Sequence, residues 1–132
     1  MSEIFKNADN TSATGKDFDV IIIGAGFAGM YMLHRMREMG LKSIVFEAGD
    51  GVGGTWYWNR YPGARCDVES VQYSYQFDKE LEQEWTWSEK YSPQPEILKY
   101  ANHVADRFKL RKDIRLNTRI TSSNYDEEKA EW

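Results

Sequence analysis

Short β-branched runs alternate with longer stretches of helical spacing along this chain, and that pattern predicts an α/β fold. Residues 18–23 are an apolar run closed by Gly24, which predicts a strand buried on both faces, as in a parallel sheet. Residues 27–39 then follow a helical period, and residues 43–47 form a second apolar run that ends in an acid. Together they predict a right-handed βαβ unit with a parallel sheet and a crossover helix.

The helix predicted over residues 27–39 has two distinct faces, and Gly40 follows as a suitable C-terminal residue. We expect its methionine-rich face to pack against the sheet, because methionine fills gaps beneath a helix. That face consists of Ala28, Met32, Met36 and Met39, while the polar face consists of His34, Arg35, Arg37 and Glu38.

The second half of the chain predicts one further helix and two further strands. Residues 48–68 are rich in glycine without a helical period, which predicts a long loop, and long loops in compact domains often carry function. Pro95 is suited to the start of a helix. Residues 113–118 and 119–125 read as strands, and a polar turn after them predicts the start of an antiparallel hairpin. The apolar face of the helix after Pro95 consists of Ile97, Leu98, Ala101, Val104, Ala105 and Phe108.

Length and composition favour one partial domain. The 132 residues are predicted to form a flexible polar tail over 1–16 and a nucleotide-binding unit over 17–132. The sequence stops at Trp132, where the second strand of the hairpin should begin, and this predicts a truncated product. A net charge of −4 without a basic run argues against nucleic acid. No apolar run approaches the roughly 20 residues that span a bilayer. The single cysteine, Cys66, excludes an internal disulfide, and the expected location is the cytoplasm.

The motif with the clearest chemistry is Gly24-Ala25-Gly26-Phe27-Ala28-Gly29, a G-x-G-x-x-G that follows a strand and opens a helix. Gly24 permits the tight turn, Gly26 lets backbone approach a pyrophosphate, and Gly29 lets helix and strand pack closely. Free N–H groups at the helix start favour phosphate. Glu47, eighteen residues after Gly29, is placed to accept hydrogen bonds from ribose hydroxyls. Its charge repels a 2′-phosphate, so the motif predicts FAD or NAD rather than NADP.

A second motif decides between these two cofactors. The segment 51–56, Gly51-Val52-Gly53-Gly54-Thr55-Trp56, resembles the second glycine cluster of FAD-dependent oxygenases. The longer string Gly53-Gly54-x-Trp56-x4-Tyr61-Pro62-Gly63-x3-Asp67 resembles the flavin-domain fingerprint of type I Baeyer–Villiger monooxygenases, with every specified position filled. The resemblance extends from about residue 17 to residue 132.

That resemblance implies a Rossmann-like FAD-binding domain in an enzyme that uses NADPH and O₂ to insert oxygen next to a ketone carbonyl, giving esters or lactones. It implies that Asp67 is a catalytic residue beside the flavin, where it pairs with an arginine from a later part of the enzyme. The expected cofactor-binding residues are Gly24, Gly26, Phe27, Ala28, Gly29, Glu47, Gly54, Thr55, Trp56, Tyr57, Trp58, Arg65, Cys66, Asp67, Tyr73 and Ile120. No metal site is expected, since no cluster of cysteine and histidine is present.

Three readings of the function stay open at this point. The family pattern continues with a second G-x-G-x-x-G for NADPH and with the active-site arginine, and neither occurs in these residues. We therefore expect NADPH to bind mainly to a domain absent from this chain, and the chain alone to be inactive. The first alternative is a flavin monooxygenase that oxidises nitrogen or sulfur. The second is a truncated, non-catalytic FAD-binding module.

Overall fold

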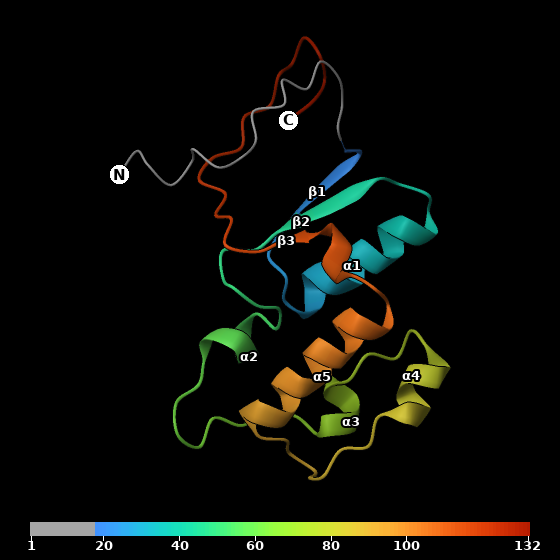
Figure 1. Ribbon diagram of the computed structural model, residues 1–132, viewed down its shortest axis with the longest axis vertical. Helices are drawn as coiled ribbons and strands as arrows, with labels where there is room; N and C mark the ends of the chain where they lie inside the picture. Colours follow the sequence, from blue (N-terminus) through green and yellow to red (C-terminus); the bar gives the residue numbers. More distant parts are fainter. Residues whose placement is uncertain (1–17) are drawn as a thin grey trace.

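The computed structural model of the protein describes residues 18–132, so the expected tail over 1–16 lies outside the described residues. Its centre is a three-stranded parallel sheet in the order β1-β2-β3 (Figure 1). The strands are β1 (Val20–Ile23), β2 (Ser43–Phe46) and β3 (Ile114–Arg115). The helix α1 (Phe27–Glu38) connects β1 to β2, which confirms the predicted βαβ unit.

The sheet register aligns the ends of the strands at one edge. Ile23 pairs with Phe46, and Phe46 pairs with Arg115, so all three strands finish at the same level. The N–H of Gly24 donates to the carbonyl of Phe46 at 2.8 Å, which continues the pairing one residue beyond β1. The carboxyl edge of the sheet is where ligands bind in open α/β folds.

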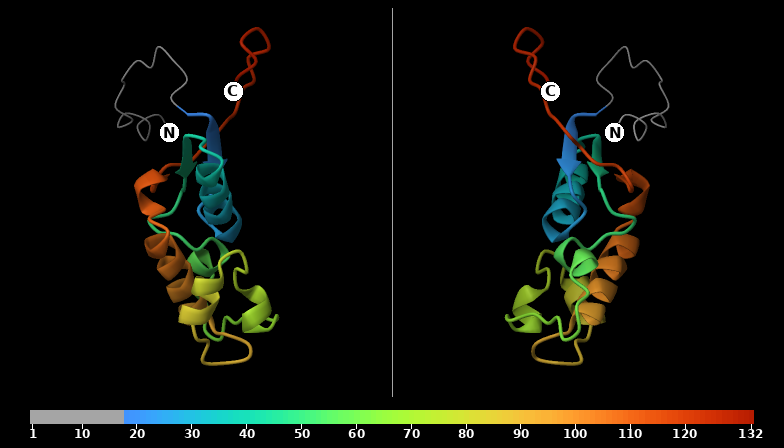
Figure 2. Two further views of the ribbon diagram at one scale, coloured as in Figure 1. Left: turned by 90° about the vertical axis from the view of Figure 1, so that its right-hand side faces the viewer. Right: turned by 90° about the vertical axis from the view of Figure 1, so that its left-hand side faces the viewer.

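Helices α2, α3, α4 and α5 lie below α1 in these views, whereas the C-terminal segment after β3 extends above it (Figures 1 and 2). Only α5 was expected from the sequence. The short α2 interrupts the predicted loop over 48–68, and α3 and α4 arise between the loop and α5. The bounds are α2 (Thr55–Trp58), α3 (Ser70–Tyr73), α4 (Lys79–Glu84), α5 (Gln94–Arg107) and the 3-10 turn η1 (Arg111–Asp113).

The main core lies between α1, the inner face of the sheet and α5. The expected apolar face of α5 is confirmed, because four of its six residues are buried and Leu98 and Phe108 are half-buried. Tyr100 adds a large buried side chain to the same helix. The buried residues that make up this core are Ile22, Ala25, Met30, Leu33, Val45, Val52, Leu81, Tyr100, Ala101, Val104, Ala105, Leu110 and Ile114.

Two expectations about burial around the sheet were wrong. Strand β1 is not buried on both faces, because Ile21 and Ile23 are 53% and 64% exposed, whereas Ile22 is buried. The described helices cover only the face to which Ile22 points, and β1 is an edge strand. The methionine face of α1 is not its packing face either. Met30 and Leu33 are buried, while Met32 is 45% exposed.

The polar face of α1 was also assigned wrongly, since part of it faces the protein. The His34 ring lies 4.7 Å from the ring of Phe77 and 4.8 Å from that of Phe108. The Arg37 guanidinium pairs with Asp113 and donates to the carbonyl of Phe108 at 3.1 Å. These contacts join α1 to the segment between α5 and β3. The helical period was recognised correctly, but the inward direction was displaced by about one position.

The predicted strand over residues 119–125 does not form. These residues are mostly exposed and pair with no strand in the described part of the chain, and a strand needs a hydrogen-bonding neighbour. The expected hairpin is limited to one antiparallel bridge between Asp126 and Glu131. The strand predicted over 113–118 is likewise shortened to β3.

The burial pattern of α1 predicts different effects for two neighbouring truncations. Leu33→Ala should lower the free energy of unfolding by about 2–5 kcal/mol, because it opens a cavity in the core. Met32→Ala, at an exposed position of the same helix, should change it by less than about 0.5 kcal/mol. Urea denaturation of both variants measures the difference. Equal losses would contradict the described orientation of α1.

Candidate functional site

The turn after β1 forms the first part of the site. A Cβ atom at Gly29 would lie 1.9 Å from the carbonyl oxygen of Gly24, so only glycine allows α1 to pack this close to the turn. Helix α1 begins at Phe27, and no side chain caps its Gly26 end. The first N–H groups of a helix have no partner within the helix, so this end offers donors and a positive dipole to an anion.

A second glycine loop touches this turn. The N–H of Gly53 donates to the carbonyl of Ala25 at 3.0 Å. A Cβ atom at Gly54 would lie 2.8 Å from the Cα of Gly26, and Gly54 has φ +56° and ψ −118°, a conformation that other residues avoid. The two glycine motifs found in the sequence are therefore one structural unit.

Glu47 ties both loops to the sheet. Its carboxylate accepts a 2.7 Å hydrogen bond from the N–H of Ala25 and another of 2.7 Å from the N–H of Gly49. Its side chain is only 5% exposed, so two backbone donors compensate the buried charge. A carboxylate can accept about four hydrogen bonds, which leaves acceptor capacity for ribose hydroxyls. The ribose contact itself stays a prediction.

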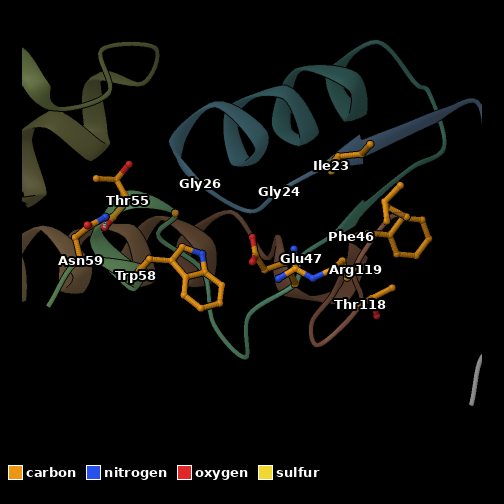
Figure 3. A pocket seen from close by; sticks show the side chains of 13 residues that line it. Ile23, Gly24, Gly26, Phe46, Glu47, Thr55, Trp58, Asn59, Thr118 and Arg119 are labelled. Atoms are coloured by element: carbon orange, nitrogen blue, oxygen red, sulfur yellow. Dashed lines mark hydrogen bonds between the residues drawn. The ribbon is translucent and has the colours of Figure 1, made fainter. Parts of the chain in front are cut away.

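A cavity of about 430 Å³ opens between these elements at the carboxyl edge of the sheet (Figure 3). In this view Thr55 and Asn59 lie at one end, Ile23, Phe46 and Thr118 lie at the other, and Glu47 and Arg119 lie between them. Of the residues expected to bind the cofactor, those lining the cavity are Gly24, Gly26, Glu47, Gly54, Thr55, Trp58 and Ile120.

A second cluster contains three of the expected cofactor-binding residues, Trp56 of α2, Cys66 and Tyr73. Trp56 is buried in a small cluster with Cys66 and Ile97, and its indole N–H donates to the Tyr73 hydroxyl at 2.9 Å. Cys66 is buried, as expected for a small apolar residue. These contacts hold the Trp56 side chain against the protein interior. Trp56 is not among the residues that line the cavity.

Tyr57 and Trp58 follow one another in α2 but have different surroundings. The Tyr57 ring lies over the loop, 2.6 Å from the place of a Cβ atom on Gly49, and its hydroxyl hydrogen-bonds to Asp50. Tyr57 therefore fixes the loop that carries the glycines. Trp58 lines the cavity and is 57% exposed, so its indole is free to meet a ligand.

The segment from Arg65 to Asp67 lies apart from the cavity lining. Arg65 pairs with Glu89 and also donates to the carbonyl of Tyr91. The N–H of Cys66 donates to the carbonyl of Ser92 at 3.0 Å, which holds the segment against the residues before α5. Asp67 is exposed.

Two tyrosines, the buried Tyr100 and the half-buried Tyr75, support the start of α1. The Tyr75 hydroxyl donates to the carbonyl of Phe27, and the Tyr100 hydroxyl accepts from the N–H of Tyr75 at 2.9 Å. Burial raises the pKa of Tyr100 to about 12 and also raises the pKa of Tyr75 well above its usual range. Both hydroxyls therefore stay protonated at neutral pH. The ring of Phe27 packs 5.3 Å from Tyr73, and Phe27 supports the turn rather than lining the cavity.

Several residues that line the cavity were not predicted from the sequence. Thr118 and Arg119 follow β3, and strand ends meet at one edge of a parallel sheet, which was the signal available for them. Asn59 is the C-terminal cap of α2, a helix that the pattern did not predict. The lining residues missed are Ile23, Phe46, Ala48, Asn59, Thr118 and Arg119.

The arrangement fits a dinucleotide better than a metal or a membrane segment. Glycine backbones, a free helix start and a buried carboxylate are what a pyrophosphate and a ribose require. Among residues 18–132, no group of histidine, cysteine and acidic residues is arranged to hold a metal ion. Within the same range, no helix has the length and apolar character needed to cross a bilayer.

Comparison with known proteins agrees with this geometry. The NAD(P)-binding Rossmann-like domain family matches residues 22–103. A solved structure of oxidized steroid monooxygenase bound to NADP superposes with a TM-score of 0.83 at 67% identity, covering 84% of this chain and 21% of that one. Cyclohexanone monooxygenase from Rhodococcus sp. Phi1 bound to NADP⁺ gives 0.83 at 50% identity, covering 85% and 21%.

Curated relatives are monooxygenases of two reaction types. A phenazine N-monooxygenase from Lysobacter antibioticus is 55% identical over 116 residues, covering 87% of this chain and 21% of the relative. Acetone monooxygenase (methyl acetate-forming) from Gordonia sp. is 50% identical over 114 residues, covering 86% and 21%. A Baeyer-Villiger monooxygenase from Pseudooceanicola batsensis is 46% identical over 125 residues, covering 94% and 23%. The chain thus spans about a fifth of the length of the relatives it matches.

The contact between the glycine loops predicts a strong effect of Gly54→Ala. The added Cβ would overlap the Cα of Gly26, so the variant should lose stability. Gly63→Ala is the matched control, because Gly63 also has a positive φ, +82°, but no atom lies within 4 Å of its Cβ position. The control should lose only the cost of the left-handed backbone, about 1–2 kcal/mol. Thermal unfolding of both variants measures the difference, and equal losses would contradict the steric argument.

The hydrogen bonds of Glu47 predict that Glu47→Gln destabilises the ligand-free protein. The amide nitrogen of glutamine would face a backbone N–H and leave it unsatisfied, at a cost of about 1–3 kcal/mol. Glu127→Gln, at an exposed position, should be neutral. Denaturant unfolding without any nucleotide checks this. If Glu47→Gln were as stable as the control, Glu47 would not hold the turn.

Proposed function

We infer that this chain, which belongs to the NAD(P)-binding Rossmann-like domain family, binds FAD as part of a flavin-dependent monooxygenase. The observation that carries this inference is the contact between the two glycine loops above the Glu47 carboxylate. The first loop and Glu47 suit any adenine dinucleotide. The second loop, with Trp58 exposed beside it, belongs to the segment that resembles FAD-dependent oxygenases.

The reaction we propose for the whole protein is a Baeyer–Villiger oxidation. NADPH and O₂ are the co-substrates, and a small ketone is converted to an ester or lactone. The acetone and cyclohexanone monooxygenases among the relatives support this class of substrate. The bound flavin would supply the chemistry of oxygen activation. The residues of this chain would hold its pyrophosphate at Gly26 and Gly54 and its adenosine ribose at Glu47.

Asp67 is the catalytic residue we propose within this chain. Its carboxylate is exposed, and its backbone is held by the neighbouring hydrogen bond between Cys66 and Ser92. A fixed, solvent-facing acid is suited to pairing with a cation from another part of the protein. Arg65 is engaged by Glu89, so it is not that cation.

Nitrogen oxidation is the second candidate, and one observation favours it. The phenazine N-monooxygenase shares 55% identity with this chain, more than the acetone monooxygenase does. Relatives of both reaction types match this same stretch of the chain, so the described residues do not separate them. A non-catalytic FAD-binding module is the third candidate.

An assay of the full-length protein separates the three. Purified protein should carry flavin absorbance and consume NADPH in the presence of small ketones, with the ester or lactone detected by mass spectrometry. Phenazine serves as the competing substrate, and an N-oxide as the only product would favour the second candidate. Bound flavin without NADPH oxidation would favour the third. Protein that takes up no FAD at all would contradict the proposed function.

A further inference from the structure

Arg119 stands out among the arginines of the described chain. Seven of the eight arginines have a partner: five pair with acidic side chains, Arg60 lies 4.9 Å over the Tyr57 ring, and Arg115 lies 6.0 Å over the Phe46 ring. Within residues 18–132, the Arg119 guanidinium has no hydrogen bond, ion pair or ring contact. Nothing in the fold therefore requires an arginine at this position.

The unpaired guanidinium lies at the wall of the cavity. Arg119 and Glu47 are the two charged residues of its lining, and the other lining side chains are neutral (Figure 3). Although both side chains reach the same cavity, no ion pair joins them. The Glu47 carboxylate is already compensated by the N–H groups of Ala25 and Gly49, so it does not need the arginine.

The order of groups along the cavity indicates which part of a dinucleotide Arg119 meets. The phosphate end is set by Gly26 and Gly54, beside Thr55, and the ribose position is set by Glu47. On the side of Glu47 away from Thr55, Figure 3 shows Arg119 next to Glu47 and then Thr118, Ile23 and Phe46, and Ile120 lines the same cavity. A base attached to a ribose at Glu47 points into this end.

We propose that Arg119 is a further cofactor-binding residue, whose planar guanidinium stacks on the adenine ring of the bound dinucleotide; this rests on the proposed function. Guanidinium planes stack on nucleobases and aromatic rings, and a flexible lysine ammonium lacks the planar surface. The contact selects for the adenosine half of the ligand. It therefore favours FAD over flavin mononucleotide, which has no adenine.

The test measures dissociation constants in the full-length protein after removal of its flavin. Arg119→Ala and Arg119→Lys should both weaken FAD and ADP by about tenfold, in line with the size of a partly exposed stacking contact. Binding of flavin mononucleotide should stay unchanged. Arg35→Ala is the matched control, because Arg35 is an exposed arginine on α1 that pairs with Glu38 away from the cavity. It should bind all three ligands as the wild type does.

Each alternative result has a distinct meaning. Wild-type affinity of Arg119→Ala for ADP would overturn the proposal while leaving FAD binding by this chain intact. Wild-type affinity of Arg119→Lys would also overturn it, since charge alone would then suffice and the contact would be to phosphate. Lower stability of ligand-free Arg119→Ala would show that the residue has a structural role instead. A wild-type protein that binds no FAD would overturn the proposed function itself.

Discussion

The close approach of two glycine loops is the constraint on which the site depends. Gly26 and Gly54 meet with no room for a Cβ atom at Gly54, and the N–H of Gly53 bonds to the carbonyl of Ala25. Gly24, Gly26 and Gly54 all line the cavity, so this contact forms part of its wall. The loops lie 28 positions apart in sequence, Gly26 to Gly54, so the contact also fixes where α2 begins. A change in either loop moves the other.

Glu47 makes this contact possible without a ligand. A buried carboxylate without partners is costly, but Ala25 and Gly49 each donate to it at 2.7 Å. The same residue receives the N–H of Thr118 at its backbone carbonyl, 2.8 Å away. The end of β2 thus joins the turn after β1, the glycine loop and the segment after β3. The cavity is built into the fold around one acidic side chain.

How far the sequence could predict this depends on the range of each interaction. The βαβ unit, the fingerprint and Glu47 follow from local pattern, and the structure confirms the unit. The inward face of α1 did not follow, because methionine spacing does not reveal that Phe77 and Phe108 pack on the other side. The strand over 119–125 failed for the same reason, since pairing depends on a neighbour that the pattern cannot name. Trp56, expected to bind the cofactor, packs against Ile97 and donates to Tyr73, and no local signal shows these contacts; its contact with a cofactor stays a prediction.

The cavity combines two kinds of wall, and they have different consequences for specificity. Its glycine end is mainly backbone, which would offer donors to the proposed pyrophosphate whatever the neighbouring side chains are, so this end alone would accept any dinucleotide. Selection must come from the side chains that follow. In the proposed complex Glu47 would disfavour a phosphate on the ribose. Trp58 offers an exposed aromatic surface, and Arg119 is a cation without a partner among residues 18–132. These three residues come from the end of β2, from α2 and from the segment after β3, so the proposed specificity would depend on elements that the glycine contact brings together.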